Sequence, residues 1–204
     1  MHSVTLNHKP TSYSSHNMSF IYFSFPGNEN YTKLLSEQNN GIEGQAEIRR
    51  FPDGESYVRV LSDVKDKKAI IVCSLHHPDN KIVALYLFAS TLKSLGAKSV
   101  FLLAPYLPYL RQDKIFNPGE ALSSAQFAAL LSGFIDGILT IDPHLHRISD
   151  LNQIYTIPAQ TLSTAPLISA WIKKNISQPF IIGPDSESEQ WAATVAAGAG
   201  APFT

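Results

Sequence analysis

Cysteine is almost absent from this chain of 204 residues, in which Cys73 stands alone. A single cysteine excludes an internal disulfide bond, and its place in the apolar run of residues 69–75 predicts a buried, reduced thiol in a cytoplasmic protein. Long apolar runs are also absent, since none approaches the roughly 18 residues that a membrane-spanning helix needs. Residues 1–17 are rich in Ser, His, Asn and Thr and lack the apolar segment of a signal peptide, so we expect a disordered extension and no membrane partner.

Charge of either sign is scarce, with 16% charged residues and a formal net charge of −1. This balance excludes a general nucleic-acid binder, which carries a basic surface, so any recognition of phosphate must be local. Two phosphate-binding patterns are missing as well. The chain contains neither Gly-x-x-x-x-Gly-Lys-[Ser/Thr] nor Gly-x-Gly-x-x-Gly after a strand-like run, which excludes a P-loop and a dinucleotide-binding fingerprint.

Apolar residues, by contrast, make up 44% of the chain, enough for a sizeable core. Short apolar and β-branched runs predict strands, and segments of helical periodicity lie between most of them. Residues 82–95 are such a segment with Gly96 as its stop, and Ser123 with Gln126 predicts a capping box ahead of another helix. Buried strands alternating with helices indicate a mainly parallel α/β sheet. The expected strands are residues 20–25, 69–75, 99–104, 137–141 and 180–183.

Residues 47–60 differ from this pattern of buried strands and helices, because apolar and polar residues alternate on both sides of Pro52, Asp53 and Gly54. Proline presets φ and glycine accepts a positive φ, so the segment predicts a turn between two antiparallel arms. A hairpin projecting from a parallel sheet suits a lid or a subunit contact, and an ordinary edge hairpin is the alternative.

A change in composition near Pro158 predicts a domain boundary. After it we expect a helix at about residues 165–174, a strand, and a further helix from residue 187 to about residue 197. A lone β–α unit has nowhere to bury its faces. We therefore expect an N-terminal domain over residues 18–158 and the incomplete start of a second domain over residues 159–204.

Four polar residues, Arg111, Gln112, Asp113 and Lys114, follow the strand expected at residues 99–104. In a sheet with helices on both faces, ligands usually bind in the crevice beyond the carboxyl ends of the strands. A cation, an amide and a carboxylate placed there could contact a polyanion and the edge of a nucleobase. A solvated loop is the alternative.

Asp142, His144 and His146 follow the strand expected at residues 137–141. Extended residues two apart point to the same side, so these side chains could face one divalent metal ion, as in metal-dependent hydrolases, or could cap the next helix. Asp185 also follows an apolar run and precedes a helix. Its carboxylate suits Mg²⁺ or a substrate hydroxyl, and equally an N-cap.

Taken together and in order, these motifs resemble ribose-phosphate diphosphokinase, also called phosphoribosyl pyrophosphate synthetase. The family transfers the diphosphoryl group of Mg-ATP to the 1-hydroxyl of ribose 5-phosphate, giving phosphoribosyl diphosphate and AMP. The resemblance implies two tandem phosphoribosyltransferase-like α/β domains, each a mainly parallel sheet with helices on both faces, and Mg²⁺ as cofactor. The motifs that carry it are Phe25-Pro-Gly-Asn-Glu29, Arg50-Phe-Pro-Asp-Gly-Glu-Ser-Tyr-Val58, Pro105-Tyr-x-x-Tyr-x-Arg-Gln-Asp113, Asp142-x-His144, Ile157-Pro158, Leu162, Pro166 and Gly183-Pro-Asp185.

The resemblance also implies roles for single residues. The hairpin would reach the nucleotide pocket of a neighbouring subunit in a homo-oligomer, the loop after residue 110 would bind ATP, and the later carboxyl-edge residues would hold Mg²⁺ and ribose 5-phosphate. The residues are Phe51, Asp53 and Glu55 for adenine, Arg111, Gln112 and Asp113 for ATP, His144 and Asp142 for the metal, and Asp185 for ribose 5-phosphate and metal.

The chain also departs from the family pattern. Lys114 stands where many members have arginine, and residues 186–189 replace small, glycine-rich residues. Family members continue into a basic catalytic loop and a loop that binds ribose 5-phosphate, and neither is in these 204 residues. We therefore expect a truncated enzyme without turnover of its own, the alternative being a non-catalytic regulatory or scaffold subunit.

Overall fold

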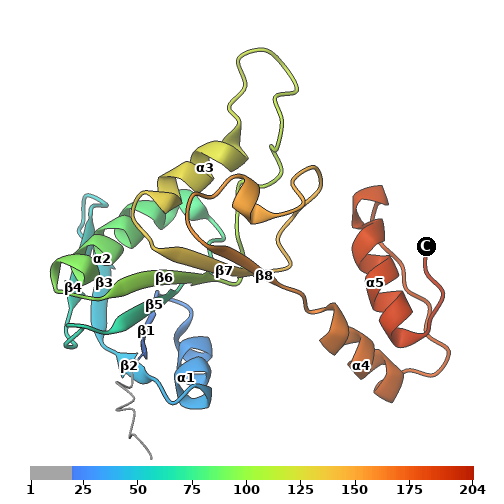
Figure 1. Cartoon of the computed structure of the whole chain (residues 1–204), viewed down its shortest axis with the longest axis horizontal. Coiled ribbons are helices and arrows are strands. Elements are labelled where there is room, and N and C mark those ends of the chain that lie inside the picture. Colours follow the sequence, from blue (N-terminus) through green and yellow to red (C-terminus); the bar gives the residue numbers. More distant parts are fainter. Residues whose placement is uncertain (1–19) are drawn as a thin grey trace, which may run out of the picture.

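A six-stranded parallel β-sheet is the centre of the computed structural model, which describes residues 20–204 (Figure 1). Its strand order is β2-β1-β5-β6-β7-β8, and every pairing is parallel. The predicted α/β sheet is therefore confirmed, whereas the extension expected at residues 1–17 lies outside the described residues. The strands are β1 (Phe20–Ser24), β2 (Ile42–Gly44), β5 (Lys68–Val72), β6 (Ser99–Ala104), β7 (Gly137–Ile141) and β8 (Ala159–Leu162).

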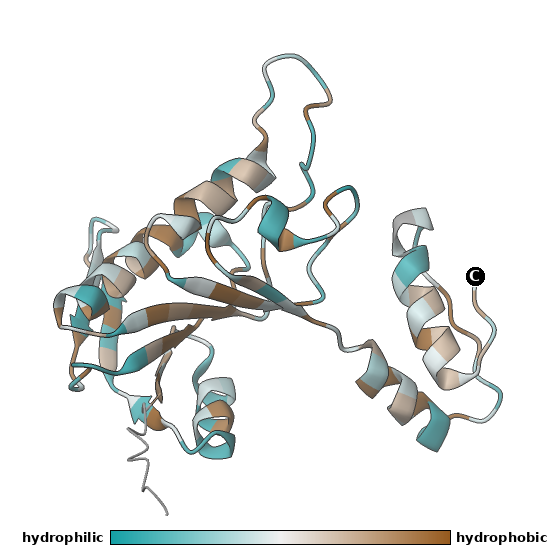
Figure 2. Cartoon of the chain, in the orientation of Figure 1, coloured by the Kyte–Doolittle hydropathy of each residue, from teal (hydrophilic) through white to brown (hydrophobic). Residues whose placement is uncertain are grey.

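Helices cover both faces of this sheet (Figure 1). α1 (Glu29–Gln38) lies on one face beside β1 and β2, and α2 (Ile82–Ser94) and α3 (Ser123–Ser132) lie on the other. The core lies under α2, where Phe88 is fully buried and packs edge-on against Phe23 of β1, with ring centroids 5.3 Å apart. Figure 2 shows apolar residues along the central strands. The described helices are all too short or too polar to cross a membrane.

The ends of α2 and α3 test two sequence predictions. α2 ends at Ser94, and Gly96 adopts a φ of 87°, the left-handed conformation that the predicted stop requires. The capping box predicted for Ser123 and Gln126 is wrong. Leu122 occupies the N-cap position, and the hydroxyl of Ser123 donates to Oε1 of Gln112 at 3.2 Å instead.

The predicted hairpin is confirmed as the antiparallel pair β3 (Ala46–Arg50) and β4 (Ser56–Val60). Its turn contains Gly54 at a φ of 93°, and Oδ1 of Asp53 accepts a hydrogen bond from the backbone N–H of Glu55 at 3.1 Å. β4 packs against α2, so the hairpin stands at the end of the lobe away from β8 (Figure 1).

Cys73 follows β5 and is fully buried, as the sequence predicts. Burial raises the pKa of its thiol to about 12, so the thiol stays protonated at neutral pH and is a poor nucleophile. This cysteine is part of the core.

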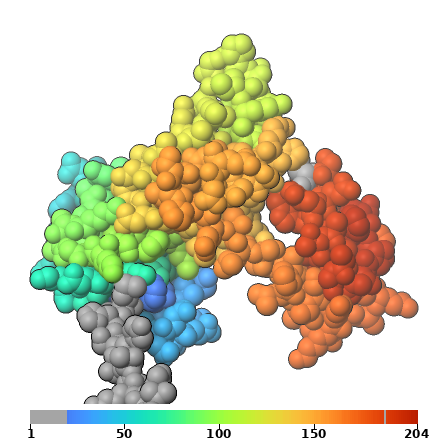
Figure 3. All heavy atoms as spheres, in the orientation of Figure 1, coloured from blue at the N-terminus to red at the C-terminus, as the bar shows by residue number. Residues whose placement is uncertain are grey.

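Residues 165–204 form a second, smaller lobe in which α4 (Ala165–Asn175) packs against α5 (Glu189–Ala199) (Figures 1 and 3). The buried hydroxyl of Ser169 donates to the carbonyl of Val195 at 2.9 Å across this helix pair. Gly198 makes the close approach possible, because a Cβ at that position would collide with Ser169. The short 3₁₀ helices η1 (Pro78–Asn80), η2 (Leu151–Gln153) and η3 (Ser186–Ser188) lie in connections.

The structure corrects two expectations about this region. The division into two domains stays a prediction, but its boundary moves, because β8 pairs with β7 and places residues 159–162 in the first sheet. The strand expected at residues 180–183 is reduced to one parallel bridge between Ile181 and Phe203. Its backbone hydrogen-bonds to Pro202 and Thr204.

Candidate functional site

A cavity of about 440 Å³ lies at the carboxyl ends of β6 and β7, between the two lobes. Its volume is within the range typical of small-molecule sites, and its position is the crevice in which α/β sheets usually bind ligands. The lining side chains come from the loop after β6, the end of β7, and the helices α4 and α5. They include Tyr106, Tyr109, Arg111, Asp142, His144, Thr164, Ile168 and Trp191.

Arg111 brings a positive charge to this cavity. Its side chain is exposed and has no hydrogen-bond or ion-pair partner within residues 20–204. The loop that carries Arg111 is attached to η1 two residues earlier, because the hydroxyl of Tyr109 donates a hydrogen bond to the carboxylate of Asp79. Tyr109 itself adopts a left-handed φ of 63°. That hydrogen bond raises the pKa of Tyr109. A guanidinium without a protein partner, at the edge of a cavity, is suited to bind an anion through two parallel hydrogen bonds.

Gln112 is held at the base of the loop that projects beyond α3 (Figure 1). Its Nε2 donates to Oε2 of Glu120 at 3.3 Å, and its Oε1 accepts from the hydroxyl of Ser123. Glu120 also accepts hydrogen bonds from Asn117 and Phe116, which hold the pKa of its carboxyl below the usual range. In the structure Gln112 therefore orders the loop, and its predicted contact with ATP stays a prediction.

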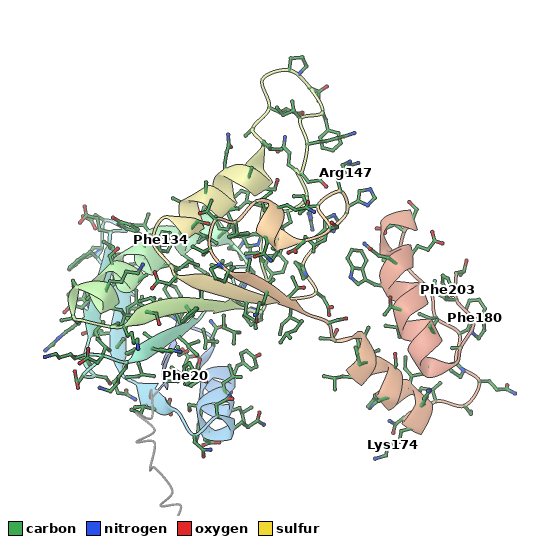
Figure 4. All side chains as sticks on the ribbon, in the orientation of Figure 1. Phe20, Phe134, Arg147, Lys174, Phe180 and Phe203 are labelled. Atoms are coloured by element: carbon green, nitrogen blue, oxygen red, sulfur yellow. The ribbon has the colours of Figure 1, made fainter. Side chains whose placement is uncertain are left out.

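Asp113 connects this loop to the segment after β7. Its Oδ1 accepts a hydrogen bond from Nη1 of Arg147 at 2.8 Å, and its Oδ2 accepts one from the backbone N–H of Arg147 at 3.1 Å. Burial by itself raises the pKa of Asp113, but the bonds from Arg147 outweigh burial, and the pKa lies below its ordinary value. Figure 4 shows Arg147 at the base of the projecting loop. The carboxylate predicted to contact ATP thus has a structural partner.

Asp142 occupies the first position after β7, with a left-handed φ of 40°. Its carboxylate accepts hydrogen bonds from the backbone N–H of Thr164, at 3.1 and 3.3 Å to the two oxygens, and from the hydroxyl of Thr164. Thr164 directly precedes α4. Asp142 therefore attaches the end of the first sheet to the start of the second lobe.

His144 faces the second lobe, where its ring stacks on the indole of Trp191 in α5. The ring centroids are 6.2 Å apart and the planes make an angle of 29°. His146 is exposed, and Asp142 is bonded to Thr164, so the alternating set predicted from the sequence does not form one cluster. Within residues 20–204 no three His, Cys, Asp or Glu side chains come together as a metal site, which leaves the hydrolase alternative without support.

The donors of this cavity nevertheless fit Mg²⁺ that arrives with a phosphorylated ligand. Mg²⁺ usually keeps several waters and is held by one or two carboxylates together with substrate phosphates, so a protein cage is not required. Asp142 and His144 both line the cavity. The carboxylate of Asp142, in a cavity that Arg111 also lines, matches that kind of shared coordination.

Other predicted site residues lie away from this cavity. Phe51, Asp53 and Glu55 are on the hairpin, at the opposite end of the first lobe, and Phe51 is 41% exposed. Asp185 is absent from the lining; its carboxylate accepts a hydrogen bond from the backbone N–H of Ser188 at 2.9 Å in a capping box at η3. The structure thus brings together Arg111, Asp142 and His144 and leaves the others apart within one chain.

Several residues of the cavity were not predicted from the sequence, among them Tyr109, Thr164 and Trp191. Tyr109 belongs to the motif Pro105-Tyr-x-x-Tyr-x-Arg-Gln-Asp113, so the sequence contained a signal for it. Thr164 and Trp191 gave none, because their contacts with Asp142 and His144 depend on how α4 and α5 pack beside the first sheet.

Comparison with known proteins bears on this site. Residues 20–134 match the family model described as the N-terminal domain of ribose phosphate pyrophosphokinase, which is more than half of the chain. The chain belongs to the ribose-phosphate pyrophosphokinase family. The matched range contains the hairpin and Arg111, whereas His144, Asp185 and Trp191 lie beyond it.

Relatives in this family extend beyond the present chain. The ribose-phosphate pyrophosphokinase of Saccharolobus solfataricus is 32% identical over 86% of this chain and 59% of its own length. That of Methanobrevibacter smithii is 32% identical over 79% of this chain and 54% of its own. The chain thus spans somewhat more than half the length of these pyrophosphokinases.

A solved structure supports the fold. The phosphoribosylpyrophosphate synthetase of Mycobacterium smegmatis superposes with a TM-score of 0.81 and 22% identity, covering 91% of this chain and 63% of that one. The similarity extends past residue 134 and includes the second lobe, because it covers nine tenths of the chain.

Proposed function

We propose that this chain is the nucleotide-binding part of a ribose-phosphate diphosphokinase, which transfers the diphosphoryl group of Mg-ATP to ribose 5-phosphate and releases AMP. The observation that carries the proposal is Arg111, a guanidinium without a protein partner at the edge of a cavity that Asp142 and His144 also line. Family membership supplies the reaction class.

The reaction needs positioning and charge neutralisation more than covalent help from the protein. The 1-hydroxyl oxygen of ribose 5-phosphate forms a bond to the β-phosphorus of ATP and releases its proton to solvent. The bond from that phosphorus to the α,β-bridging oxygen breaks, and AMP leaves with the electron pair. Arg111 contributes by holding the polyphosphate through its planar fork. The Asp113–Arg147 contact joins the loop after β6 to the segment after β7, and the Asp142–Thr164 contact joins the end of β7 to the residue before α4.

His144 and Asp142 would hold Mg²⁺ in this scheme. When bound, the ion would neutralise charge on the phosphates of the ligand. Asp142 offers oxygen lone pairs in addition to those used by Thr164, and His144 lines the same cavity.

The hairpin fits a role in a neighbouring subunit rather than in its own. Phe51 is 41% exposed, and the guanidinium of Arg49 lies 4.9 Å from its ring centroid and 4.1 Å from that of Tyr57. An exposed ring supported in this way is suited to stack on a base. We propose that Phe51, Asp53 and Glu55 reach the adenine of an adjacent copy in a homo-oligomer, that Asp185 contacts ribose 5-phosphate, and that the assembly works in the cytoplasm.

Titration calorimetry with Mg-ATP tests the nucleotide part. We expect the chain to bind, and Arg111→Ala to weaken the affinity by about tenfold or more, because a charge-assisted contact to phosphate is lost. Lys174→Ala is the matched control, since it also removes one exposed positive charge but lies at the far end of α4 (Figure 4). Absence of binding, or equal binding by the Arg111→Ala protein, would contradict the proposal.

A further inference from the structure

A carboxylate in η1 contacts the loop after β6 from outside the cavity. Oδ1 of Asp79 accepts a hydrogen bond from the hydroxyl of Tyr109, which lies 30 residues further along the chain. Tyr109 and Arg111 line the cavity, whereas Asp79 is not part of its lining. Asp79 therefore reaches the cavity through the side chain of Tyr109.

η1 gives this carboxylate a fixed place. Pro78 begins the segment with a preset φ, and the backbone N–H of Lys81 donates to the carbonyl oxygen of Pro78 at 2.8 Å, directly before α2. The guanidinium of Arg50, in the hairpin, donates to the carbonyl oxygen of Asn80. Because the residues on both sides of Asp79 are held, its side chain starts from an ordered backbone.

Tyr109 stands at a sharp turn of the nucleotide loop. Its φ of 63° is left-handed, a conformation that a bulky side chain rarely adopts without contacts that hold it. Its ring packs on that of Phe127 in α3, with centroids 4.7 Å apart, and its hydroxyl is bonded to Asp79. The side chain is thus held at its ring by one element and at its tip by another.

The turn fixes the backbone on one side of Arg111. On the other side Gln112 is bonded to Glu120 and Ser123. The guanidinium of Arg111 has no hydrogen-bond or ion-pair partner within residues 20–204. A free charged group on an ordered backbone is suited to binding an anion, because less conformational entropy is lost when the ligand arrives.

We propose that Asp79 is a positioning residue, which holds the turn at Tyr109 and thereby places Arg111 for the phosphates of a magnesium–nucleotide ligand. The role rests on the function proposed above, because it matters only if such a ligand binds beside Arg111. The charge of Asp79 acts in the opposite direction, since a carboxylate near a site for a polyanion repels the ligand. Weaker binding after its removal would therefore come from the lost hydrogen bond.

The contact itself can be tested without any ligand. The chain has eight tyrosines, which can be labelled with ¹³C at Cζ for NMR, and the resonance missing from the Tyr109→Phe chain is that of Tyr109. On Asp79→Ala this resonance should move at neutral pH. Its titration midpoint should also fall, because the bond to Asp79 raises the pKa of Tyr109. An unmoved resonance would overturn the contact.

Titration calorimetry with Mg-ATP tests the role. We expect Asp79→Ala to weaken the affinity about 3- to 10-fold, the range of one lost hydrogen bond. Asp79→Asn is the matched variant, because it removes the same charge but keeps an acceptor oxygen for the hydroxyl of Tyr109. It should bind Mg-ATP at least about half as tightly as the unsubstituted chain. Far-UV circular dichroism confirms that each variant is folded.

A double-mutant cycle tests whether the effect passes through Arg111. In an Arg111→Ala background, Asp79→Ala should change the affinity by less than about twofold, because the group that it positions is gone. A general loss of stability would weaken binding in both backgrounds equally, so an additive cycle would overturn the role.

The remaining outcomes separate this role from the proposed function. Equal affinity of the Asp79→Ala and unsubstituted chains, with Arg111→Ala still weak, overturns the role of Asp79 and leaves the proposed function intact. An Asp79→Asn chain as weak as Asp79→Ala shows that the hydrogen bond is not what matters, and overturns the role as well. Absence of Mg-ATP binding by the unsubstituted chain overturns the proposed function and this role with it.

Discussion

The Asp113–Arg147 pair joins the loop that carries Arg111 to the segment that carries His144. The side chain of Asp113 is 3% exposed and that of Arg147 is 40% exposed. Both carboxylate oxygens are used, one by the guanidinium at 2.8 Å and one by a backbone N–H at 3.1 Å. The substitution Asp113→Ala removes both acceptors and leaves every donor in place, so it measures what this tie contributes.

The expected cost follows from the geometry. A hydrogen bond to a charged group contributes about 1.5–3 kcal/mol when its partner is lost in a buried position. The guanidinium of Arg147 keeps access to water and is rehydrated in the variant, so the cost lies toward the lower end. We expect Asp113→Ala to lower the free energy of unfolding by about 2 kcal/mol, which lowers Tm by about 4–8 °C for a chain of this length.

Urea denaturation at pH 7 measures this loss, with Asp63→Ala as the matched control. Asp63 also pairs with a cation, Lys67 at 2.9 Å, but its side chain is 78% exposed, so its removal should leave the denaturation midpoint nearly unchanged. Because the 111–114 loop loses its anchor, Asp113→Ala should also weaken Mg-ATP binding, whereas Asp63→Ala should not.

The pH dependence of this pair has a definite sign. The hydrogen bonds from Arg147 hold the folded-state pKa of Asp113 below its ordinary value of about 3.9. A lowered pKa stabilises the fold above the ordinary value, and the contribution is lost as the pH falls through the folded-state pKa. The stability gap between the unsubstituted and Asp113→Ala chains should therefore shrink in acid.

Two results would refute this reasoning. Asp113→Ala could lose no more stability than Asp63→Ala, which would show that the buried carboxylate contributes nothing beyond a surface charge. Alternatively, a double-mutant cycle with Arg147→Ala could show no coupling, which would place the effect of Asp113 outside this pair.

Two further predictions concern the core. The thiol of Cys73, fully buried and with its pKa raised to about 12 by burial, should not react with a disulfide reagent in the folded chain and should react on unfolding in urea; fast reaction of the native chain would contradict this. Gly44→Ala should lose about 1–3 kcal/mol of unfolding free energy in urea, because its Cβ would collide with the ring of Phe23. A Gly44→Ala chain as stable as the unsubstituted chain would contradict the clash.

Much of the first lobe followed from local sequence pattern. The apolar runs of β1, β5, β6 and β7 could be recognised directly as strands of a sheet. Gly96 and the turn at Gly54 were readable because both need a positive φ, which few other residues accept.

The elements that were missed have weak local signals. β2 is three residues long at the edge of the sheet, and β8 has one buried residue among four, so neither carries a run that periodicity can detect. Each becomes a strand because the chain returns beside β1 or β7. The reverse holds at residues 180–183, where an apolar run forms a single parallel bridge within the described residues.

The sequence by itself determined which polar residues lie at the edge of the sheet where the candidate site is. Arg111, Asp142 and His144 could be placed there because parallel strands end at a common edge, whatever the rest of the fold does. Only the tertiary structure decided how those side chains are used. Asp142 is bonded to Thr164 and His144 is stacked on Trp191 because α4 and α5 pack beside that edge, and contacts between residues that distant in sequence follow from packing rather than from spacing.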